Sequence, residues 1–433
     1  MVSFSLRFQA VARVHNTLPR RGPIAFEQLE SRNLLSAGGL TATQAVPLLS
    51  FSPAASSPSA AGSGGPTIYT PAQIRHAYGF DQVSFSTSRG AVVGNGAGQT
   101  IAIIDAYNDP TIKSDLAAFD STFRLAAPPS FTQVSEYGGS ASGLAVNAGW
   151  AMEISLDVEW AHAMAPNANI LLVEARSDYL SDLLTAVNYA RHQPGVSTVS
   201  MSWGGSEFSS ESSYDQYFTA PAGHAGITFV ASAGDDGAPA SWPAVSANVV
   251  AVGGTSLYLT GSGSYGSETG WSAGGGGRSL FESEPTFQLA VQSSGKRVAP
   301  DVAYDADPNS GLYVYDSVPY DGYTGWWDVG GTSAGAPQWA ALLAIADQGR
   351  ALLGAAPLNS AAASLYAIPR GDFHDVTAGN NGYTARPGYD MVTGLGTPLA
   401  NAVIQDLVGP KPAAAATVPP LSMPTTRMGL FLT

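Results

Sequence analysis

Short apolar runs alternate with amphipathic segments along most of the chain. The apolar runs are continuous, which is typical of parallel strands covered on both faces, so we expect strands at residues 100–107, 169–175, 197–203, 226–234 and 248–254. Between and around them the pattern predicts helices near 109–123, around 151–164, over 179–191 and near 212–223. This order predicts one α/β domain with a mostly parallel central sheet flanked by helices.

Both ends of the chain lack this pattern. Residues 1–35 carry arginines followed by "FEQLESRNLLSAGG", which resembles the N-terminal segments of many large exported bacterial proteins, so we expect an export or sorting segment. Residues 36–66 are rich in Ala, Ser, Gly and Pro and predict a flexible linker, and residues 409–433 predict a similar tail. The folded domain is therefore expected over residues 67–408.

Composition narrows the function classes. The 433 residues carry a net charge of −14, which argues against nucleic acid as a partner and suits a protein that stays soluble outside cells. The chain has no cysteine, so disulfides, thiolate metal sites and cysteine nucleophiles are excluded. No run of 18 apolar residues occurs, so no transmembrane helix is expected.

The stretch "VGGTSAGAPQWAALLAIA" places Ser333 after a glycine pair at the start of an apolar helix. Free N–H groups and the helix dipole favour developing negative charge there, which suits a nucleophilic serine. A serine that merely caps the helix fits the same letters. The second group that the chemistry needs is a base that takes the proton of the Ser333 hydroxyl.

Two bases are open. Asp105 and His162 with Ser333 reproduce the chain order of a subtilisin-like triad, but His162 lies in an Ala-His-Ala context near a helix end, where a C-terminal charge or a surface group is usual. Glu153 and Asp157 stand at i, i+4 on the same helix, so both carboxyls share one face, opposite to His162. Two like charges so placed are unfavourable unless they share a proton. A plain acidic helix face remains the alternative.

A further carboxyl follows a buried strand, in "FVASAGDDG", at the edge where open α/β sheets build their sites. Together with "YTPAQIRHAYGF", "IAIIDAYNDP", "EISLDVEWAHAMAPNANI", "SMSWG", "SAGGGGRS", "PDVAYDADP" and "GGTSAGAPQWA", this chain resembles the sedolisin, or serine-carboxyl peptidase, family from about residue 69 to residue 407. The resemblance implies a subtilisin-like three-layer fold. It also implies Ser333 as nucleophile, Glu153 as general base, Asp157 as the group that orients it, and Asp235 as oxyanion donor.

The C-terminal stretch "FHDVTAGNNGYTARPGYDMVTGLGTP" contains two aspartates around a Gly/Asn-rich loop, a pattern that suits Ca²⁺, although a plain turn-rich loop fits the composition as well. The family resemblance implies one structural Ca²⁺ here. Its ligands would be the side chains of Asp375 and Asp390 and the carbonyls of Val376, Arg386 and Gly388. Arg386 replaces the glycine often found in the family, which makes it the least secure ligand.

The sequence thus predicts a secreted, monomeric bacterial endopeptidase that cuts proteins or peptides at acid pH through an acyl-enzyme on Ser333, with association with the cell surface left open. Sedolisins are normally made with a long folded propeptide, whereas about 66 residues precede the expected domain here. Two alternatives stay open: a catalytically silent surface or binding protein that reuses the fold, and a neutral subtilisin-like protease that uses Asp105, His162 and Ser333.

Overall fold

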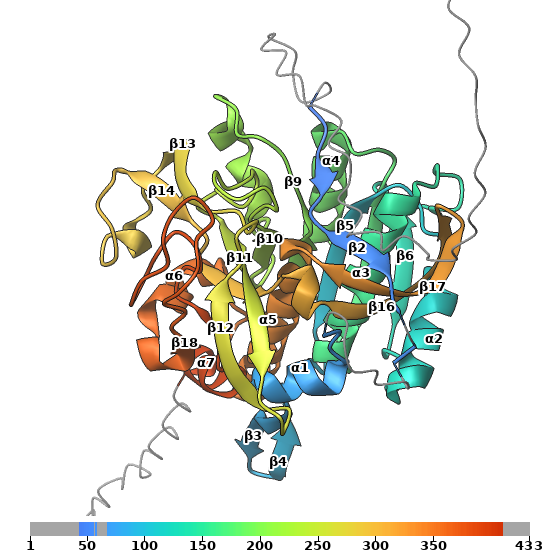
Figure 1. The fold of residues 1–433 in the computed structure, drawn as a ribbon, viewed down its shortest axis with the longest axis horizontal. Helices are drawn as coiled ribbons and strands as arrows, with labels where there is room; N and C mark the ends of the chain where they lie inside the picture. Colours follow the sequence, from blue (N-terminus) through green and yellow to red (C-terminus); the bar gives the residue numbers. More distant parts are fainter. Residues whose placement is uncertain (1–42, 56, 59–66, 410–433) are drawn as a thin grey trace, which may run out of the picture.

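An eight-stranded sheet forms the centre of the computed structural model, which describes residues 43–55, 57–58 and 67–409 (Figure 1). The strand order is β12-β11-β10-β8-β5-β7-β6, and β15 pairs with β11. Every pairing in this sheet is parallel except that of β11 with β12. The predicted α/β class with a mostly parallel sheet is confirmed.

The elements have the following bounds. The sheet contains β5 (Thr100–Ala106), β6 (Phe131–Ser135), β7 (Asn169–Ala175), β8 (Val196–Met201), β10 (Thr228–Ser232), β11 (Val249–Leu259), β12 (Tyr265–Gly270) and β15 (Val302–Asp305). Smaller sheets contain β1 (Val46–Pro47), β2 (Ser50–Pro53), β3 (Ser84–Thr87), β4 (Gly90–Val93), β9 (Trp203–Gly204), β13 (Gly277–Ser283), β14 (Lys296–Ala299), β16 (Leu312–Tyr320), β17 (Tyr323–Gly330), β18 (Phe373–His374) and β19 (Thr397–Pro398). The α-helices are α1 (Pro71–Ala77), α2 (Ile112–Phe123), α3 (Ala148–Met164), α4 (Leu180–Arg191), α5 (Gly335–Leu352), α6 (Ala361–Ala367) and α7 (Ala400–Val408). The short 3₁₀ helices are η2 (Phe80–Gln82), η3 (Glu211–Phe218), η4 (Thr286–Gln288), η5 (Pro308–Ser310), η6 (Thr332–Ala334) and η7 (Arg370–Asp372).

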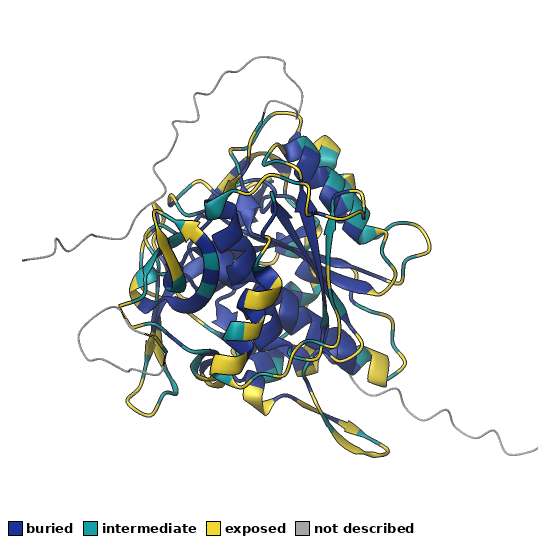
Figure 2. Cartoon of the chain, turned by 90° about the vertical axis from the view of Figure 1, so that its right-hand side faces the viewer, coloured by how far each residue is buried: buried dark blue, intermediate teal, exposed yellow. Residues whose placement is uncertain are grey.

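Side chains of the central strands alternate between two apolar clusters, one on each face of the sheet. In β5, Ile101 and Ile103 belong to the cluster that α3, α5 and α7 cover, whereas Ala102 and Ile104 belong to the cluster beneath α4. Successive side chains of a strand point to opposite faces, so a continuous apolar run is what this burial requires. Figure 2 shows the central sheet as buried, with exposed residues on outer helices, turns and loops.

Helix α3 lies inside the molecule and carries the two candidate carboxyls there. The Asn147 side chain caps its start by accepting from the N–H groups of Gly149 and Trp150, at 3.0 and 3.2 Å. Residues 149–164 are all buried, so the apolar surface extends around the whole helix. A carboxyl on such a helix has no access to water, so Glu153 and Asp157 are two carboxyls buried within the core.

The predicted linker over residues 36–66 is wrong for its central part. Residues 46–47 form β1, which pairs antiparallel with β9, and residues 50–53 form β2, which pairs antiparallel with β17 and lies beside it in Figure 1. The strand β2 forms because β17 has an open edge and because Phe51 packs edge-on against Tyr320 and Trp327. Composition did not reveal this pairing, since its partners lie more than 150 residues away.

The helix expected near 212–223 is the 3₁₀ helix η3, which fits a Ser- and Asp-containing segment with weak α-helical propensity. The expected export segment 1–35, and the tail except for residue 409, lie outside the described residues. Within the described residues, no helix has both the length and the apolar character needed to span a membrane.

Candidate active site

Ser333 lies at the turn from β17 into α5, on the one-turn helix η6. The turn needs Gly331, whose φ of 115° is unfavourable for a residue with a side chain. The Ser333 side chain is fully buried, and its Oγ donates to Glu153 Oε2 at 2.9 Å. The Ser202 carbonyl oxygen lies 3.1 Å from the same Oγ. A carboxyl oxygen therefore stands where a base must stand to take the serine proton.

Asp157 lies one helical turn after Glu153 on α3. The Ser202 hydroxyl donates to Asp157 Oδ1 at 2.7 Å. Glu153 Oε1 and Asp157 Oδ2 are both buried without a hydrogen-bond partner. Burial raises the pKa of both groups well above the usual range, and the charge of Asp157 raises that of Glu153 further. The pair is therefore arranged to share one proton.

Asp235 follows β10 and contacts the residue before the serine. Its Oδ1 accepts from the Thr332 N–H at 2.8 Å and from the Thr332 hydroxyl at 2.7 Å. Its Oδ2 is buried without a hydrogen-bond partner. Burial raises the pKa of Asp235 to about 7, against the lowering effect of the Thr332 bonds. At acid pH this carboxyl holds a proton, and Oδ2 is the oxygen free to carry it.

Two further residues belong to the cluster: Asp105, which the sequence offered only as part of a subtilisin-like triad, and Ser202, to which it assigned no role. Asp105, at the carboxyl end of β5, is fully buried, and neither of its oxygens has a hydrogen-bond partner. Burial, and then the charge of Glu174, raises its pKa, and its own charge raises the pKa of Glu153 and Asp157. Ser202 follows β8 and contacts both Asp157 and Ser333. The signal in both cases was a polar residue at the carboxyl end of a buried strand.

His162 lies away from this cluster. It is fully buried, which corrects the expectation of a surface group. Its Nε2 lies 3.0 Å from the Ala126 carbonyl oxygen and 3.2 Å from Asp120 Oδ1, at the end of α2 and the loop that follows. The imidazole is thus engaged with α2, and no hydrogen bond links it to Ser333 or Asp105. This geometry disfavours the subtilisin-like triad.

The predicted calcium ligands gather in the loop between β18 and β19. The Gly388 N–H donates to both oxygens of Asp375 at 3.1 and 3.0 Å, and the Arg386 N–H donates to Asp390 Oδ2 at 2.8 Å. The Thr393 hydroxyl lies 3.4 Å from both the Val376 carbonyl oxygen and Asp390 Oδ1. Two carboxylates and nearby carbonyls are the hard oxygen donors that Ca²⁺ prefers, so the residues present fit the ion.

A second acidic group lies elsewhere. Asp109, Asp115 and Asp316 are buried, with one carboxyl oxygen of each within 4.8 Å of the others. Serine and threonine hydroxyls and backbone N–H groups donate to these carboxyls. Neither the sequence pattern nor the family resemblance points to an ion here, and we assign no metal to this group.

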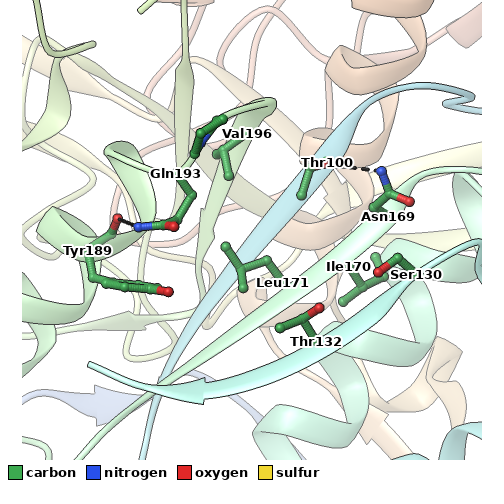
Figure 3. A pocket seen from close by; sticks show the side chains of 10 residues that line it. Thr100, Ser130, Thr132, Asn169, Ile170, Leu171, Tyr189, Gln193 and Val196 are labelled. Atoms are coloured by element: carbon green, nitrogen blue, oxygen red, sulfur yellow. Dashed lines mark hydrogen bonds between the residues drawn. The ribbon is translucent and has the colours of Figure 1, made fainter. Parts of the chain in front are cut away.

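One hollow of the surface lies far from the serine. It has a volume of about 280 Å³ and lies where β5, β7 and β8 begin, with Thr100, Asn169 and Val196 in its lining (Figure 3). Ser333 and its carboxyls lie at the opposite, carboxyl edge of the parallel strands. The segment around Leu48 lies beside Ser333, whose N–H donates to the Leu48 carbonyl at 3.0 Å.

Comparison with known proteins gives consistent matches. A model of the subtilase family matches residues 96–360. Kumamolisin of Bacillus sp. (strain MN-32) is 34% identical over 398 residues, which covers 82% of this chain and 66% of kumamolisin. Sedolisin of Pseudomonas sp. (strain 101) is 36% identical over 205 residues, which covers 40% of this chain and 33% of sedolisin. The chain thus spans just under two thirds of kumamolisin's own length and about a third of sedolisin's.

Among solved structures, Pseudomonas sedolisin complexed with two molecules of pseudo-iodotyrostatin matches with a TM-score of 0.67 at 28% identity. The match covers 79% of this chain and 98% of that one. Its extent shows that most of this chain shares the fold of that protein.

Proposed function

The chain belongs to the subtilase family, in its sedolisin-like serine-carboxyl branch, and we propose that it hydrolyses peptide bonds at acid pH with Ser333 as nucleophile. The observation that carries this proposal is the 2.9 Å hydrogen bond from Ser333 Oγ to the buried carboxyl of Glu153. The solved relative is itself described as a serine-carboxyl proteinase. A buried base with a raised pKa suits proton transfer from a hydroxyl.

The steps follow from the positions of the groups. Ser333 Oγ attacks the carbonyl carbon of the peptide while Glu153 Oε2 takes the hydroxyl proton, and Asp157 holds Glu153 in place through their shared proton. The negative oxygen of the tetrahedral intermediate lies toward the Ser333 N–H and the protonated Oδ2 of Asp235. Glu153 then gives its proton to the leaving amine, and water hydrolyses the acyl-enzyme by the same route.

The setting proposed for this reaction is outside the cell. The net charge of −14 and the low share of charged residues, 12%, suit a protein that stays soluble in an acidic medium. We propose proteins and peptides as substrates, cut in endopeptidase fashion by a monomer. A catalytically silent binding protein is the second candidate, which the same assay tests.

Ser333→Ala is expected to abolish proteolysis and leave the fold intact. The purified wild type should degrade a casein-like substrate between about pH 3 and about pH 6, where the Asp235 carboxyl holds its proton. The variant removes only one buried oxygen, so its melting curve should match that of the wild type. Undiminished degradation by the variant would assign the activity to another group, and an inactive wild type would favour the binding protein.

Removing calcium is expected to lower the melting temperature. Bound Ca²⁺ would tie Asp375 to Asp390 across the loop in a chain without disulfides. At an ion concentration of 100 Kd the stabilisation is about 2.7 kcal/mol, which for a domain of this size corresponds to roughly 5 °C. Excess EDTA should produce this fall, and added Ca²⁺ should reverse it. Asp375→Asn should melt alike with and without the ion, and a wild type that is equally indifferent removes the metal from the proposal.

A further inference from the structure

A serine, a histidine and an aspartate lie together on the surface, where the hairpin between β11 and β12 turns beside α1 (Figure 1). Asp81 Oδ2 lies 2.8 Å from His76 Nδ1, and Ser264 Oγ lies 3.3 Å from His76 Nε2. His76 belongs to the last turn of α1, Asp81 to η2 and Ser264 to the hairpin turn. Each ring nitrogen therefore faces one partner, in the order of a nucleophile, a base and a carboxylate, and we call the three residues the surface triad.

The carboxylate decides which ring nitrogen carries the proton. An ionised carboxyl only accepts hydrogen bonds, so the contact with Asp81 places the proton of a neutral His76 on Nδ1. Nε2 then holds a lone pair and only accepts, so the Ser264 hydroxyl donates to it. Ser262 Oγ is a second neighbour of Ser264 Oγ, at the longer distance of 3.4 Å. The surface triad thus places a base where it takes the proton of the Ser264 hydroxyl.

Buried hydrogen bonds tie α1 to the hairpin beneath the surface triad. Just before α1, the Tyr69 hydroxyl donates to the Leu257 carbonyl of β11 at 2.9 Å. Just after α1, the Tyr78 hydroxyl donates to Glu268 Oε1 of β12 at 2.6 Å. Both ends of the helix are therefore attached to the hairpin. The helix that carries the histidine and the turn that carries the serine are held beside each other by elements of the core, which is what a preorganised site requires.

A hollow of about 310 Å³ opens beside the surface triad. Gln73, which lies one helical turn before His76, and Gly263, the neighbour of Ser264, both line it. The other lining residues are Thr67, Tyr69, Tyr258, Leu259, Thr260 and Gly261. All of these side chains are uncharged, and the volume is at the lower end of the range for ligand sites. The hollow therefore suits a small uncharged group held next to the serine.

We propose that the surface triad is a second hydrolytic site, which cleaves esters that join a short uncharged acyl group to an acidic alcohol such as a phenol. Ser264 Oγ bonds to the ester carbonyl carbon as His76 Nε2 takes the hydroxyl proton, and Asp81 stabilises the imidazolium. The ester C–O bond then breaks, and the alcohol leaves with that proton. Water next gives a proton to Nε2 while its oxygen bonds to the acyl carbon. The acid leaves, and Ser264 Oγ regains its proton from Nε2.

The exposure of the surface triad decides which substrates it cleaves. The side chains of His76 and Asp81 are 47% and 42% exposed, so water weakens the attraction between imidazolium and carboxylate. Proton transfer to a positioned base contributes roughly 10²-fold to 10⁴-fold to a rate. A gain of this size suits an ester whose alcohol leaves readily. Aryl esters, rather than the peptide bonds proposed for Ser333, are therefore the expected substrates.

The experiment uses the full chain with Ser333→Ala at about pH 8, where a histidine base is neutral. The probes are p-nitrophenyl butyrate and a fluorophosphonate, which loses fluoride as it phosphonylates an activated serine. The Ser333→Ala chain should hydrolyse the ester and take up one phosphonyl group, which peptide mass mapping places on Ser264. Adding Ser264→Ala or His76→Ala should lower kcat/KM for the ester at least roughly 100-fold and abolish labelling. Adding Asp81→Asn should lower kcat/KM roughly fivefold to tenfold.

Two further variants are matched controls. Ser267→Ala removes an exposed serine of the same hairpin, and His192→Ala removes an exposed histidine at the end of α4. Each should keep kcat/KM for the ester within about twofold, because neither side chain belongs to the surface triad. Circular dichroism checks the fold of every variant.

The labelling and the rates decide the proposal together. An ester rate that Ser264→Ala leaves unchanged overturns it, even where His76→Ala lowers the rate, because the histidine then acts without the serine. Phosphonylation of another residue, or of none, overturns it as well. With Ser333 intact, Ser264→Ala should degrade a casein-like substrate at acid pH as the wild type does, so the failure of either proposal leaves the other standing.

Discussion

Glu153→Gln is expected to lower kcat by roughly 10⁴-fold to 10⁶-fold, the range seen when the base of a serine protease is removed. The amide keeps the size of the carboxyl and its contact with Ser333 Oγ, which the structure places at 2.9 Å, but it cannot accept the hydroxyl proton. Asp157→Asn should cost nearly as much, because Glu153 then loses the group with which it shares a proton. The kcat of the double variant should be at most about tenfold below that of the less active single variant.

Helix α3 supplies the matched control for this experiment. Glu159 is fully buried on the same helix, but its Oε2 accepts from the Tyr315 N–H at 3.0 Å, away from the serine. Glu159→Gln should therefore keep kcat within about threefold, once rates are corrected for the folded fraction. His162→Ala should also stay active. An inactive His162→Ala beside an active Glu153→Gln would reinstate the subtilisin-like triad.

The central sheet could be predicted from the sequence because parallel strands that are buried on both faces have continuous apolar runs. The run over residues 100–107 is apolar at every position that the two clusters cover, and β5 occupies residues 100–106. The same pattern does not predict β1 and β2. Their residues carry few apolar letters in a row, and their strand partners lie in β9 and β17, so nothing local distinguishes them from a linker.

For the site, the four predicted residues do come together, because helical spacing fixes Glu153 against Asp157 and strand ends fix Asp235 and Ser333 at one edge. The sequence could not show which oxygen of Asp235 lacks a hydrogen-bond partner. The N–H and the hydroxyl of Thr332 both donate to Asp235 Oδ1, whereas Oδ2 has no hydrogen-bond partner. The burial of His162 and the contact between Leu48 and Ser333 likewise depend on packing between segments far apart in the chain.

Stability is expected to fall as pH rises, and this bears on any rate measured at neutral pH. Burial raises the pKa of several carboxyls to about 7, among them Glu174, Glu282, Asp328 and Asp347. The folded state keeps protons that the unfolded chain gives up near its ordinary carboxyl pKa of about 4. Their contribution to stability is complete below about pH 4 and is lost as pH rises through about 7. Circular dichroism at each pH therefore accompanies the rate measurements.

The wild-type rate of peptide hydrolysis is expected to form a bell centred on acid pH and to fall steeply above pH 7. Asp235 donates to the oxyanion only while protonated, and its pKa of about 7 sets the alkaline limb. The acid limb appears where the Glu153–Asp157 pair takes up a second proton and Glu153 no longer accepts one. A histidine base, by contrast, loses activity below its pKa of roughly 6.5. A wild-type optimum near pH 8 contradicts the carboxyl mechanism.

Asp235→Asn isolates the group that sets the alkaline limb. The amide oxygen can take the place of Oδ1 and keep both bonds from Thr332, at 2.8 and 2.7 Å, so the nitrogen replaces the unpartnered Oδ2. That nitrogen donates at every pH, because an amide does not titrate in this range. The variant's remaining activity should therefore extend at least about one pH unit further toward alkaline than that of the wild type. An unchanged alkaline limb would show that another carboxyl controls it, and the shared proton of Glu153 and Asp157 would then be the group left to account for the loss.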